Sequence, residues 1–320
     1  MMTKIKVLAS TVTFGKINKT PKERMESLGW NVVTNPYGRP LTPDEFSELG
    51  ADADALIVGN DKITADVIDR CPRIKIIAKH GIGVDAIDIK YANSKGIYVT
   101  NAPGSNATEV ADIAVADMIN LARGIIMSNK DTKAGKWNKP KVPMCMEGKT
   151  VGIIGTGHIG CQVASRLHGF GMKLLGYDVF ENEEAKSHGI KYVSLDEILT
   201  TADYITLHAP LVKETQHLLN AERIATLKPG VVIVNTARSQ LIDYTALEAG
   251  LKSGAIRGYA ADVYDHEPPE HLPVYDLDNV IVTAHIGGTT KESNLRMGNM
   301  AVDNVIAALT GKIPPNILKA

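Results

Sequence analysis

The stretch Val151–Gly160, with the sequence VGIIGTGHIG, constrains the fold of this chain more than any other. Its first four residues form an apolar run typical of a buried strand, and three glycines follow at Gly155, Gly157 and Gly160. Residues 159–170 then carry apolar side chains at helical spacing. Strand, glycine turn and helix together match the fingerprint of a dinucleotide-binding site.

Each glycine of the fingerprint has its own physical task. We expect Gly155 to permit the tight turn and Gly157 to let a pyrophosphate approach the backbone. Gly160 is expected to let the helix pack closely on the strand. The helix N-terminus then offers N–H groups and the positive end of the helix dipole to the phosphates.

An acidic residue supports this interpretation. A second predicted strand, Lys173–Tyr177, ends at Asp178, which lies 23 residues after Gly155. An acid at about this spacing accepts hydrogen bonds from the adenosine ribose hydroxyls and repels a 2′-phosphate. No arginine follows directly, because the next residues are Val179 and Phe180. The sequence therefore predicts NAD rather than NADP; the alternative is a glycine-rich turn with an unrelated aspartate.

Bulk composition excludes several classes of protein. The 320 residues suffice for two domains, and 44% hydrophobic with 22% charged residues is ordinary for a globular protein. A net charge of −1 points to neither nucleic acid nor an anionic membrane surface. Cys71, Cys145 and Cys161 have wide, unrelated spacings that fit no metal site and no disulfide framework, so we expect a reduced, cytoplasmic setting. No signal peptide or membrane span is predicted.

Strands and helices alternate on both sides of the fingerprint. Five apolar runs between residues 5 and 100 alternate with helical patterns, and the alternation resumes after Asp178. Such alternation predicts an α/β fold with parallel sheets covered by helices on both faces. We expect two doubly wound domains, the second inserted into the first if the predicted C-terminal helix, 291–309, returns to the N-terminal domain.

A long helix is predicted between these two series. It runs from Ser105, a good capping residue, to about Ser128, and Asn101–Gly104 before it resembles a hinge. With the turn at Gly287–Thr289, that hinge suggests closure of a cleft. The helix is more apolar than one packing surface requires, so we expect a homodimer through the cofactor domain.

Three polar residues follow predicted strands in the second half of the chain. They are Arg238, Glu267 and His285. Ligands of open α/β sheets lie beyond the carboxyl ends of the strands, so all three can converge on a nicotinamide. Singly, each has an ordinary alternative: a solvated arginine, a loop glutamate or a structural histidine.

Four segments in order resemble the D-isomer-specific 2-hydroxyacid dehydrogenases. They are GKTVGIIGTGHIG from Gly148, NTARSQLID from Asn235, ADVYDHEP from Ala261 and AHIGGT from Ala284. The segment KHGIGVDAID from Lys79 extends the resemblance to nearly the whole chain. It implies an NAD-dependent oxidoreductase for small 2-keto and 2-hydroxy acids, with a Rossmann NAD-binding domain at 102–287 and a flavodoxin-like substrate-binding domain at 1–101 plus 288–320.

The resemblance also implies a role for each residue. Arg238 binds the substrate carboxylate and carbonyl with its planar guanidinium, His285 is the general acid and base, and Glu267 pairs with His285 and fixes its tautomer. The backbone N–H groups around Gly81, Ile82 and Gly83 bind the carboxylate. The NAD site would comprise Gly155, Gly157, His158, Ile159, Gly160, Asp178, Thr236, Ala237, Arg238, Asp262 and His285, and no metal is expected.

The sequence departs from this family at two places. Ser239 follows Arg238 where glycine is usual, which we expect to tighten or shift that turn. The arginine that phosphoglycerate-specific relatives carry after the third strand is missing from Val58–Lys62, and Asp61 takes a position near the expected phosphate. Lys62 or Lys79 offers partial compensation. Phosphoglycerate dehydrogenase and a non-catalytic NAD-sensing protein therefore remain as alternatives, and substrate identity, direction and stereochemistry stay open.

Overall fold

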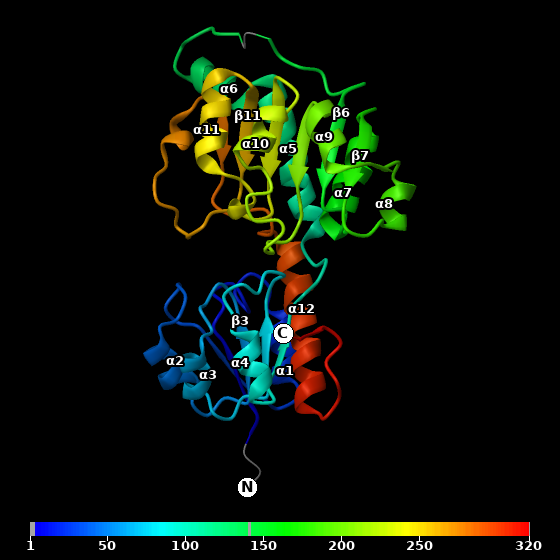
Figure 1. Ribbon diagram of the computed structural model, residues 1–320. Coiled ribbons are helices and arrows are strands. Elements are labelled where there is room, and N and C mark those ends of the chain that lie inside the picture. Colours follow the sequence, from blue (N-terminus) through cyan, green and yellow to red (C-terminus); the bar gives the residue numbers. More distant parts are fainter. Residues whose placement is uncertain (1–3, 140–141, 320) are drawn as a thin grey trace. The chain divides into compact units, whose positions relative to one another are not determined.

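The computed structural model describes residues 4–139 and 142–319. Its contacts divide the chain into two compact units, which we call the terminal unit (Met1–Asn106 with Thr289–Ala320) and the central unit (Ala107–Gly288). The chain leaves the terminal unit after Asn106 and returns to it after Gly288. The two units are the blue-to-cyan segment with the red one, and the green-to-orange segment, of Figure 1.

The terminal unit contains a sheet in the order β13-β5-β4-β3-β1-β2. Neighbouring strands from β1 to β5 are parallel, which gives the flavodoxin-like order 2-1-3-4-5. β13 is antiparallel, with Ile317 opposite Thr100, so the expectation of a wholly parallel sheet is wrong at this edge. The strands are β1 (Lys6–Ala9), β2 (Asn31–Thr34), β3 (Ala55–Val58), β4 (Ile76–Lys79), β5 (Tyr98–Thr100) and β13 (Ile317–Leu318).

Helices cover both faces of this sheet because its strands are apolar on both sides. Phe46, Val67 and Ala92 of α2, α3 and α4 pack in one buried cluster, whereas Met25 of α1 and Val305 of α12 pack in another. The return of α12 to this sheet confirms the expected insertion of one doubly wound unit into the other. The helices are α1 (Thr20–Glu26), α2 (Pro43–Gly50), α3 (Ala65–Arg70), α4 (Ile89–Ser94) and α12 (Lys291–Leu309).

The central unit contains a seven-stranded parallel sheet in the order β12-β11-β10-β9-β6-β7-β8. Strand order reverses between β6 and β9, and this is the point at which open α/β sheets bind ligands. The strands are β6 (Thr150–Ile154), β7 (Lys173–Tyr177), β8 (Lys191–Tyr192), β9 (Tyr204–Leu207), β10 (Val231–Asn235), β11 (Ile256–Ala261) and β12 (Val280–Val282).

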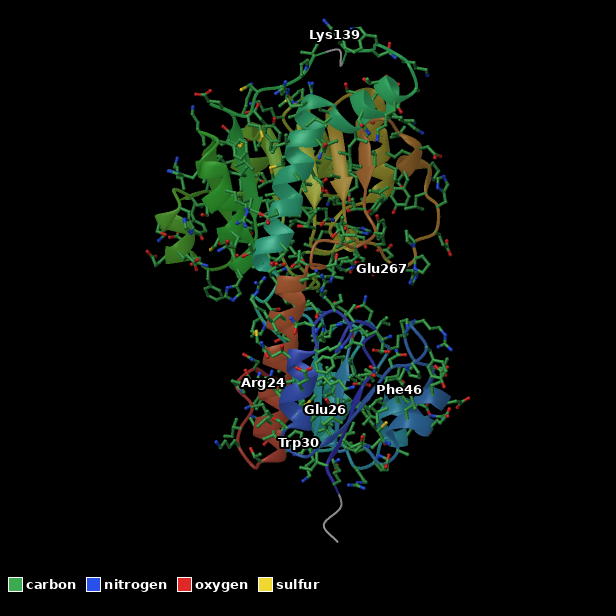
Figure 2. All side chains as sticks on the ribbon, turned by 180° about the vertical axis from the view of Figure 1, so that it is seen from behind. Arg24, Glu26, Trp30, Phe46, Lys139 and Glu267 are labelled. Atoms are coloured by element: carbon green, nitrogen blue, oxygen red, sulfur yellow. The ribbon has the colours of Figure 1, made fainter. Side chains whose placement is uncertain are left out.

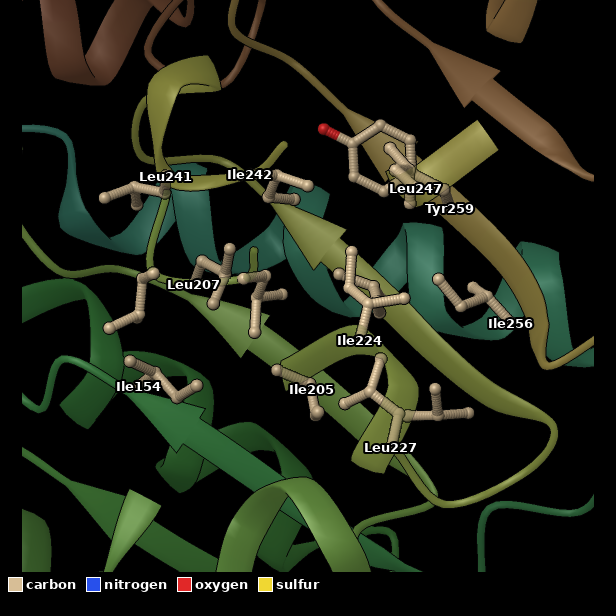
Figure 3. Packing of buried hydrophobic residues seen from close by; sticks show 14 of the residues in the cluster. Ile154, Ile205, Leu207, Ile224, Leu227, Leu241, Ile242, Leu247, Ile256 and Tyr259 are labelled. Carbon is tan, nitrogen blue, oxygen red and sulfur yellow. The ribbon is translucent and has the colours of Figure 1, made fainter. Parts of the chain in front are cut away.

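Two buried clusters join the central sheet to its helices. One contains residues of α9, α10 and α11, and Figure 3 shows its packing around Leu207, Ile224 and Tyr259. The other contains residues of α5, α7 and α8. The helices are α5 (Ala107–Arg123), α6 (Ile125–Lys133), α7 (His158–His168), α8 (Glu183–Ser187), α9 (Leu195–Thr201), α10 (Ala221–Thr226) and α11 (Tyr244–Ser253), with short 3-10 turns η1 (Ser239–Leu241) and η2 (Pro273–Asp276).

The prediction of one helix from Ser105 to Ser128 is wrong. Gly124 has a left-handed backbone (φ +62°), so α5 ends at Arg123 and α6 begins at Ile125. Glycine reaches this conformation without steric cost and commonly ends a helix in this way. Ser105 precedes α5 by two residues and donates its hydroxyl to the carbonyl of Ala102 instead of capping the helix.

No helix in the described part of the chain is long and apolar enough to cross a membrane. Within the same residues, no three His, Cys, Asp or Glu side chains are grouped in a way that fits a metal ion.

Candidate active site

The glycine turn after β6 lies against the end of β9. Gly155 has φ +93°, and a Cβ atom there would lie 2.5 Å from the backbone of both His208 and Ala209. A Cβ on Gly160 would lie 2.2 Å from the carbonyl oxygen of Gly155. These two positions therefore exclude any side chain, because both contacts are with backbone.

Gly157 differs from Gly155 and Gly160 because it has open space around it. A Cβ there would meet nothing within 4 Å, and Gly157 is the N-cap residue of α7. Among the described residues, no side chain caps this helix end, His158 is exposed and Ile159 is half-buried. The helix N-terminus can therefore receive an anionic group that approaches the backbone at Gly157, as a pyrophosphate requires.

Asp178 follows β7 and holds the glycine turn through Thr156, the residue after Gly155. Its Oδ2 accepts a hydrogen bond of 2.7 Å from the backbone N–H of Thr156, and its Oδ1 accepts one of 2.7 Å from the N–H of Val179. Thr156 itself is buried. The carboxylate thus lies where strand β7 ends, beside the glycine turn, as the position of a ribose acceptor requires.

His208 and Thr236 follow the next two strands, β9 and β10. Nδ1 of His208 lies 3.3 Å from the Thr236 hydroxyl, and Nε2 lies 2.9 Å from the hydroxyl of Thr206. Desolvation lowers the pKa of His208 to about 3, which keeps the ring neutral. Thr236 and Ala237 are both buried at this edge of the sheet.

Asp262 is the buried residue that follows β11, and it holds the loop after β12. Its carboxylate accepts hydrogen bonds of 2.6 Å from the Thr283 hydroxyl, 2.8 Å from Ile286 N and 2.7 Å from Gly287 N. A Cβ on Gly287 would lie 2.8 Å from Oδ2 of Asp262. This anchoring fixes the backbone directly after His285, which has φ +51°, a conformation that side-chain-bearing residues adopt only when neighbours impose it.

Arg238, Glu267 and His285 follow three neighbouring strands, β10, β11 and β12. Nδ1 of His285 lies 2.5 Å from Oε1 of Glu267, and their side chains are 47% and 33% exposed. Because the carboxylate contacts Nδ1, Nε2 of the ring is left to face another partner. Figure 2 shows Glu267 on a loop at the end of the central unit toward which its strands point.

Arg238 is half-buried, and its backbone is held by Asn235. The Asn235 amide donates to the carbonyl of Arg238 (2.8 Å) and accepts from the N–H of Ala237 (3.0 Å). The guanidinium donates to the Ala237 carbonyl at 2.6 Å. A short 3-10 turn, η1, begins at Ser239 directly after Arg238.

The terminal unit holds the other expected substrate-binding segment by itself. Gly81 has φ +149° and follows β4, and the side chain of Asn101 donates a 2.9 Å hydrogen bond to the carbonyl of Ile82. Lys79 is buried and donates to the Gly59 carbonyl at 2.5 Å. Gly83, the third residue of this segment, is half-buried.

Asp61 is also buried in the terminal unit. It accepts hydrogen bonds from the Ser10 hydroxyl (2.7 Å), Leu41 N (3.0 Å) and Gly59 N (3.0 Å). Its carboxylate therefore organises the loop after β3.

Residues 115–287, more than half of the chain, match the family model described as D-isomer specific 2-hydroxyacid dehydrogenase, NAD binding domain. The chain belongs to this family. Membership makes it an NAD-dependent 2-hydroxyacid dehydrogenase, with NAD as its cofactor, and confirms the resemblance found in the sequence.

Relatives named for different activities resemble this dehydrogenase. A glyoxylate reductase from Korarchaeum cryptofilum is 38% identical over 87% of this chain and 86% of its own length. A D-3-phosphoglycerate dehydrogenase from Methanocaldococcus jannaschii is 40% identical over 87% of this chain, but only 54% of its own length. The solved structure of a D-lactate dehydrogenase from Aquifex aeolicus, complexed with NAD and lactic acid, has a TM-score of 0.84 at 30% identity and covers 98% of this chain and 99% of that one.

Three residues at the dehydrogenase's candidate site were missed in the sequence. His208 lies beside Gly155, and its signal was the position of His-Ala-Pro directly after a strand at the reversal of strand order. Asn235, whose amide holds the Arg238 turn, was quoted within a motif but given no role. Asp117 of α5 is buried, and its Oδ2 has no hydrogen-bond partner among the described residues. Nothing in the sequence of this helix indicates that its carboxylate is unpaired.

Proposed function

We propose that this dehydrogenase reduces a small, unphosphorylated 2-keto acid, of the size of glyoxylate or hydroxypyruvate, to the 2-hydroxy acid. The observation that carries the proposal is the 2.5 Å contact between His285 and Glu267 at the carboxyl edge of the NAD-binding sheet. A histidine oriented by a carboxylate at that edge suits proton transfer to a carbonyl oxygen.

NADH, when bound at the glycine turn and Asp178, would supply the hydride for the carbonyl carbon of the 2-keto acid. His285 gives the proton from Nε2 to the carbonyl oxygen and takes it back in the oxidative direction. Glu267 holds Nδ1 and stabilises the protonated ring. Arg238 binds the carboxylate and the carbonyl oxygen together, because its guanidinium presents two parallel donors.

The remaining expected contacts belong to the same proposal. Gly157, His158 and Ile159 receive the pyrophosphate, Asp178 the adenosine ribose, and Thr236, Ala237 and Asp262 the nicotinamide half of NAD. The N–H groups of Gly81–Gly83 bind the substrate carboxylate. We accordingly assign NAD binding to 102–287 and substrate binding to 1–101 with 288–320, and a cytoplasmic location stays a prediction.

The loop after β3 favours an unphosphorylated substrate over a phosphorylated one. Asp61 brings a negative charge to the loop, and the Lys79 ammonium is held by the Gly59 carbonyl. Asp61 repels a phosphate, and the Lys79 ammonium already donates one of its three protons to the Gly59 carbonyl.

The test is NADH oxidation by the purified protein with a panel of acceptors. The panel contains glyoxylate, hydroxypyruvate, pyruvate, longer and branched 2-keto acids, and 3-phosphohydroxypyruvate. We expect one small unphosphorylated acid to have a kcat/KM at least tenfold above that of 3-phosphohydroxypyruvate. A preference for the phosphorylated acid would instead assign phosphoglycerate dehydrogenase activity, and binding of NADH without turnover on any acid would favour an NAD-sensing role.

We also propose that the chain forms a homodimer through the central unit. The apolar side chains of α5 do not supply the contact surface, because most of them are buried. The support lies instead in α6 and the segment after it, where Ile126, Met127 and Trp137 are exposed by 48%, 42% and 83%. These residues line a cavity of about 1010 Å³, and Figure 2 shows nearby Lys139 at the end of the unit opposite Glu267.

A second copy suits this surface because a two-fold interface uses the same patch on both subunits, and exposed apolar patches of this kind mark association sites. Light scattering after size exclusion should give twice the mass of one chain. The pair Ile126→Glu and Trp137→Ala should give single-chain mass, whereas Val212→Glu, at an exposed apolar residue away from the cavity, should leave the dimer intact. A wild-type monomer at micromolar concentration would refute the proposal.

A further inference from the structure

Ser239 directly follows Arg238, and its side chain forms a hydrogen bond with another loop. The residue is 2% exposed, and its hydroxyl donates a 2.5 Å hydrogen bond to Oδ1 of Asp265. Gln240 Oε1 lies 3.1 Å from the same hydroxyl, which has a single proton to give. The shorter contact to the charged acceptor is therefore the dominant one.

This hydrogen bond joins the two loops that carry catalytic groups. Ser239 directly follows Arg238, and Asp265 precedes Glu267 by two residues. A glycine at position 239 has no atom with which to make the connection.

A second hydrogen bond extends the connection to the segment between β12 and His285. The hydroxyl of Tyr264, the residue before Asp265, donates to the carbonyl of Thr283 at 2.5 Å. Desolvation raises the pKa of Tyr264 to about 12, so the phenol keeps its proton at neutral pH. Thr283 precedes His285 by two residues and also donates its hydroxyl to Asp262.

Aromatic packing holds Tyr264, and with it the adjacent Asp265, in place. The Tyr264 ring meets Tyr275 edge to face with centroids 6.0 Å apart, and Tyr275 meets Tyr244 in the same way at 6.5 Å. Ser239, Tyr244, Tyr264, Asp265 and Tyr275 line one small cavity of about 110 Å³. Tyr264 and Asp265 are therefore each held, Tyr264 to Thr283 after β12 and Asp265 to Ser239 of η1.

We propose that Ser239 and Asp265 are positioning residues that set Glu267 against His285 and hold the Arg238 turn in register with that pair. This proposal rests on the proposed function for its kinetic consequences. Loss of the bridge frees the loop on which Glu267 lies, so His285 loses its orientation and kcat falls. It also loosens the turn after Arg238, so the KM for the 2-keto acid rises.

The experiment compares Ser239→Ala, Asp265→Ala and the double variant with wild type. We expect each single variant to lower kcat/KM by about tenfold, through both kcat and KM, and the double variant to be no worse than either one, because both remove the same contact. Asp265→Asn retains an acceptor oxygen and should stay within about threefold of wild type. Ser253→Ala, which removes a hydroxyl bonded to Gly250 O in the same unit, is the control.

A spectroscopic measurement tests the bridge independently of turnover. With ¹⁵N-histidine labelling, the short contact to Glu267 should give a downfield Nδ1–H proton resonance, assigned by its loss in His285→Gln. Ser239→Ala should weaken or broaden it, and Ser253→Ala should leave it unchanged. An unaltered resonance, additive kinetic effects, or kcat and KM within twofold of wild type in Ser239→Ala would each overturn the proposal. A silent acceptor panel with an altered resonance would refute the proposed function alone.

Discussion

Nδ1 of His285 lies 2.5 Å from Oε1 of Glu267, although the two residues follow different strands, β12 and β11. The backbone at His285 has φ +51°, and the two N–H groups after it are held by Asp262. The pair is therefore built by buried anchors rather than by local sequence, and its imidazole is oriented before substrate arrives.

His285→Ala should lower kcat by about 10²- to 10⁴-fold, because the general acid and base is lost. NADH binding should persist, since the glycine turn and Asp178 lie elsewhere on the sheet edge. Steady-state kinetics with the preferred acid and fluorescence titration of NADH measure the two effects separately. Turnover close to that of wild type would remove His285 from the proposed chemistry.

Asp178→Ala should raise the ratio of NADPH to NADH kcat/KM by about tenfold or more, because it removes the ribose acceptor and the repulsion of a 2′-phosphate. The carboxylate also holds Thr156 N at 2.7 Å, so the KM for both cofactors should increase. Asp178→Asn is the matched control: it removes the charge but keeps one acceptor oxygen for the turn. Equal cofactor ratios in all three proteins would argue against the ribose contact.

Much of the fold could be predicted because local pattern and tertiary environment agree. Residues 55–58 are an unbroken apolar run, and 204–207 and 231–235 are apolar apart from Thr206 and Asn235; the structure buries every residue of all three strands. The candidate catalytic residues could be placed for a related reason. Each follows a strand, and parallel strands bring their carboxyl ends to one edge of a sheet.

The rest depended on contacts that a linear pattern does not contain. Ile317–Leu318 is too short to carry a strand signal and becomes β13 only by pairing with β5. α5 ends because Gly124 has a left-handed backbone. A single glycine inside an otherwise helical pattern does not by itself predict the end of a helix. The closeness of His208 to Gly155 depends on the pairing of β9 with β6, which the linear sequence does not show.

Gly157→Ala and Gly160→Ala should separate binding from folding. At Gly157 a Cβ meets nothing within 4 Å and the backbone is extended, so the variant should fold like wild type and lose at least about tenfold in NADH affinity. At Gly160 a Cβ lies 2.2 Å from a carbonyl oxygen, so we expect a loss of about 1–3 kcal/mol in the free energy of unfolding. Thermal denaturation and NADH titration test both, and unchanged NADH affinity in Gly157→Ala would contradict pyrophosphate binding at this turn.

The buried carboxyl of Asp117 predicts a pH dependence of stability. Desolvation, with the nearby Asp262 charge as the second cause, raises the pKa of Asp117 to about 7. Because the folded state then holds a proton that the unfolded chain releases near pH 4, stability should decrease as pH rises from about 4 to about 7 and stay low above. Asp117→Asn keeps the shape without the charge, so it should raise the unfolding free energy on the order of 1–3 kcal/mol at pH 8 and leave it unchanged near pH 4. Thermal denaturation of both proteins across this range measures the difference, and an equal gain at pH 4 and pH 8 would show that charge is not its cause.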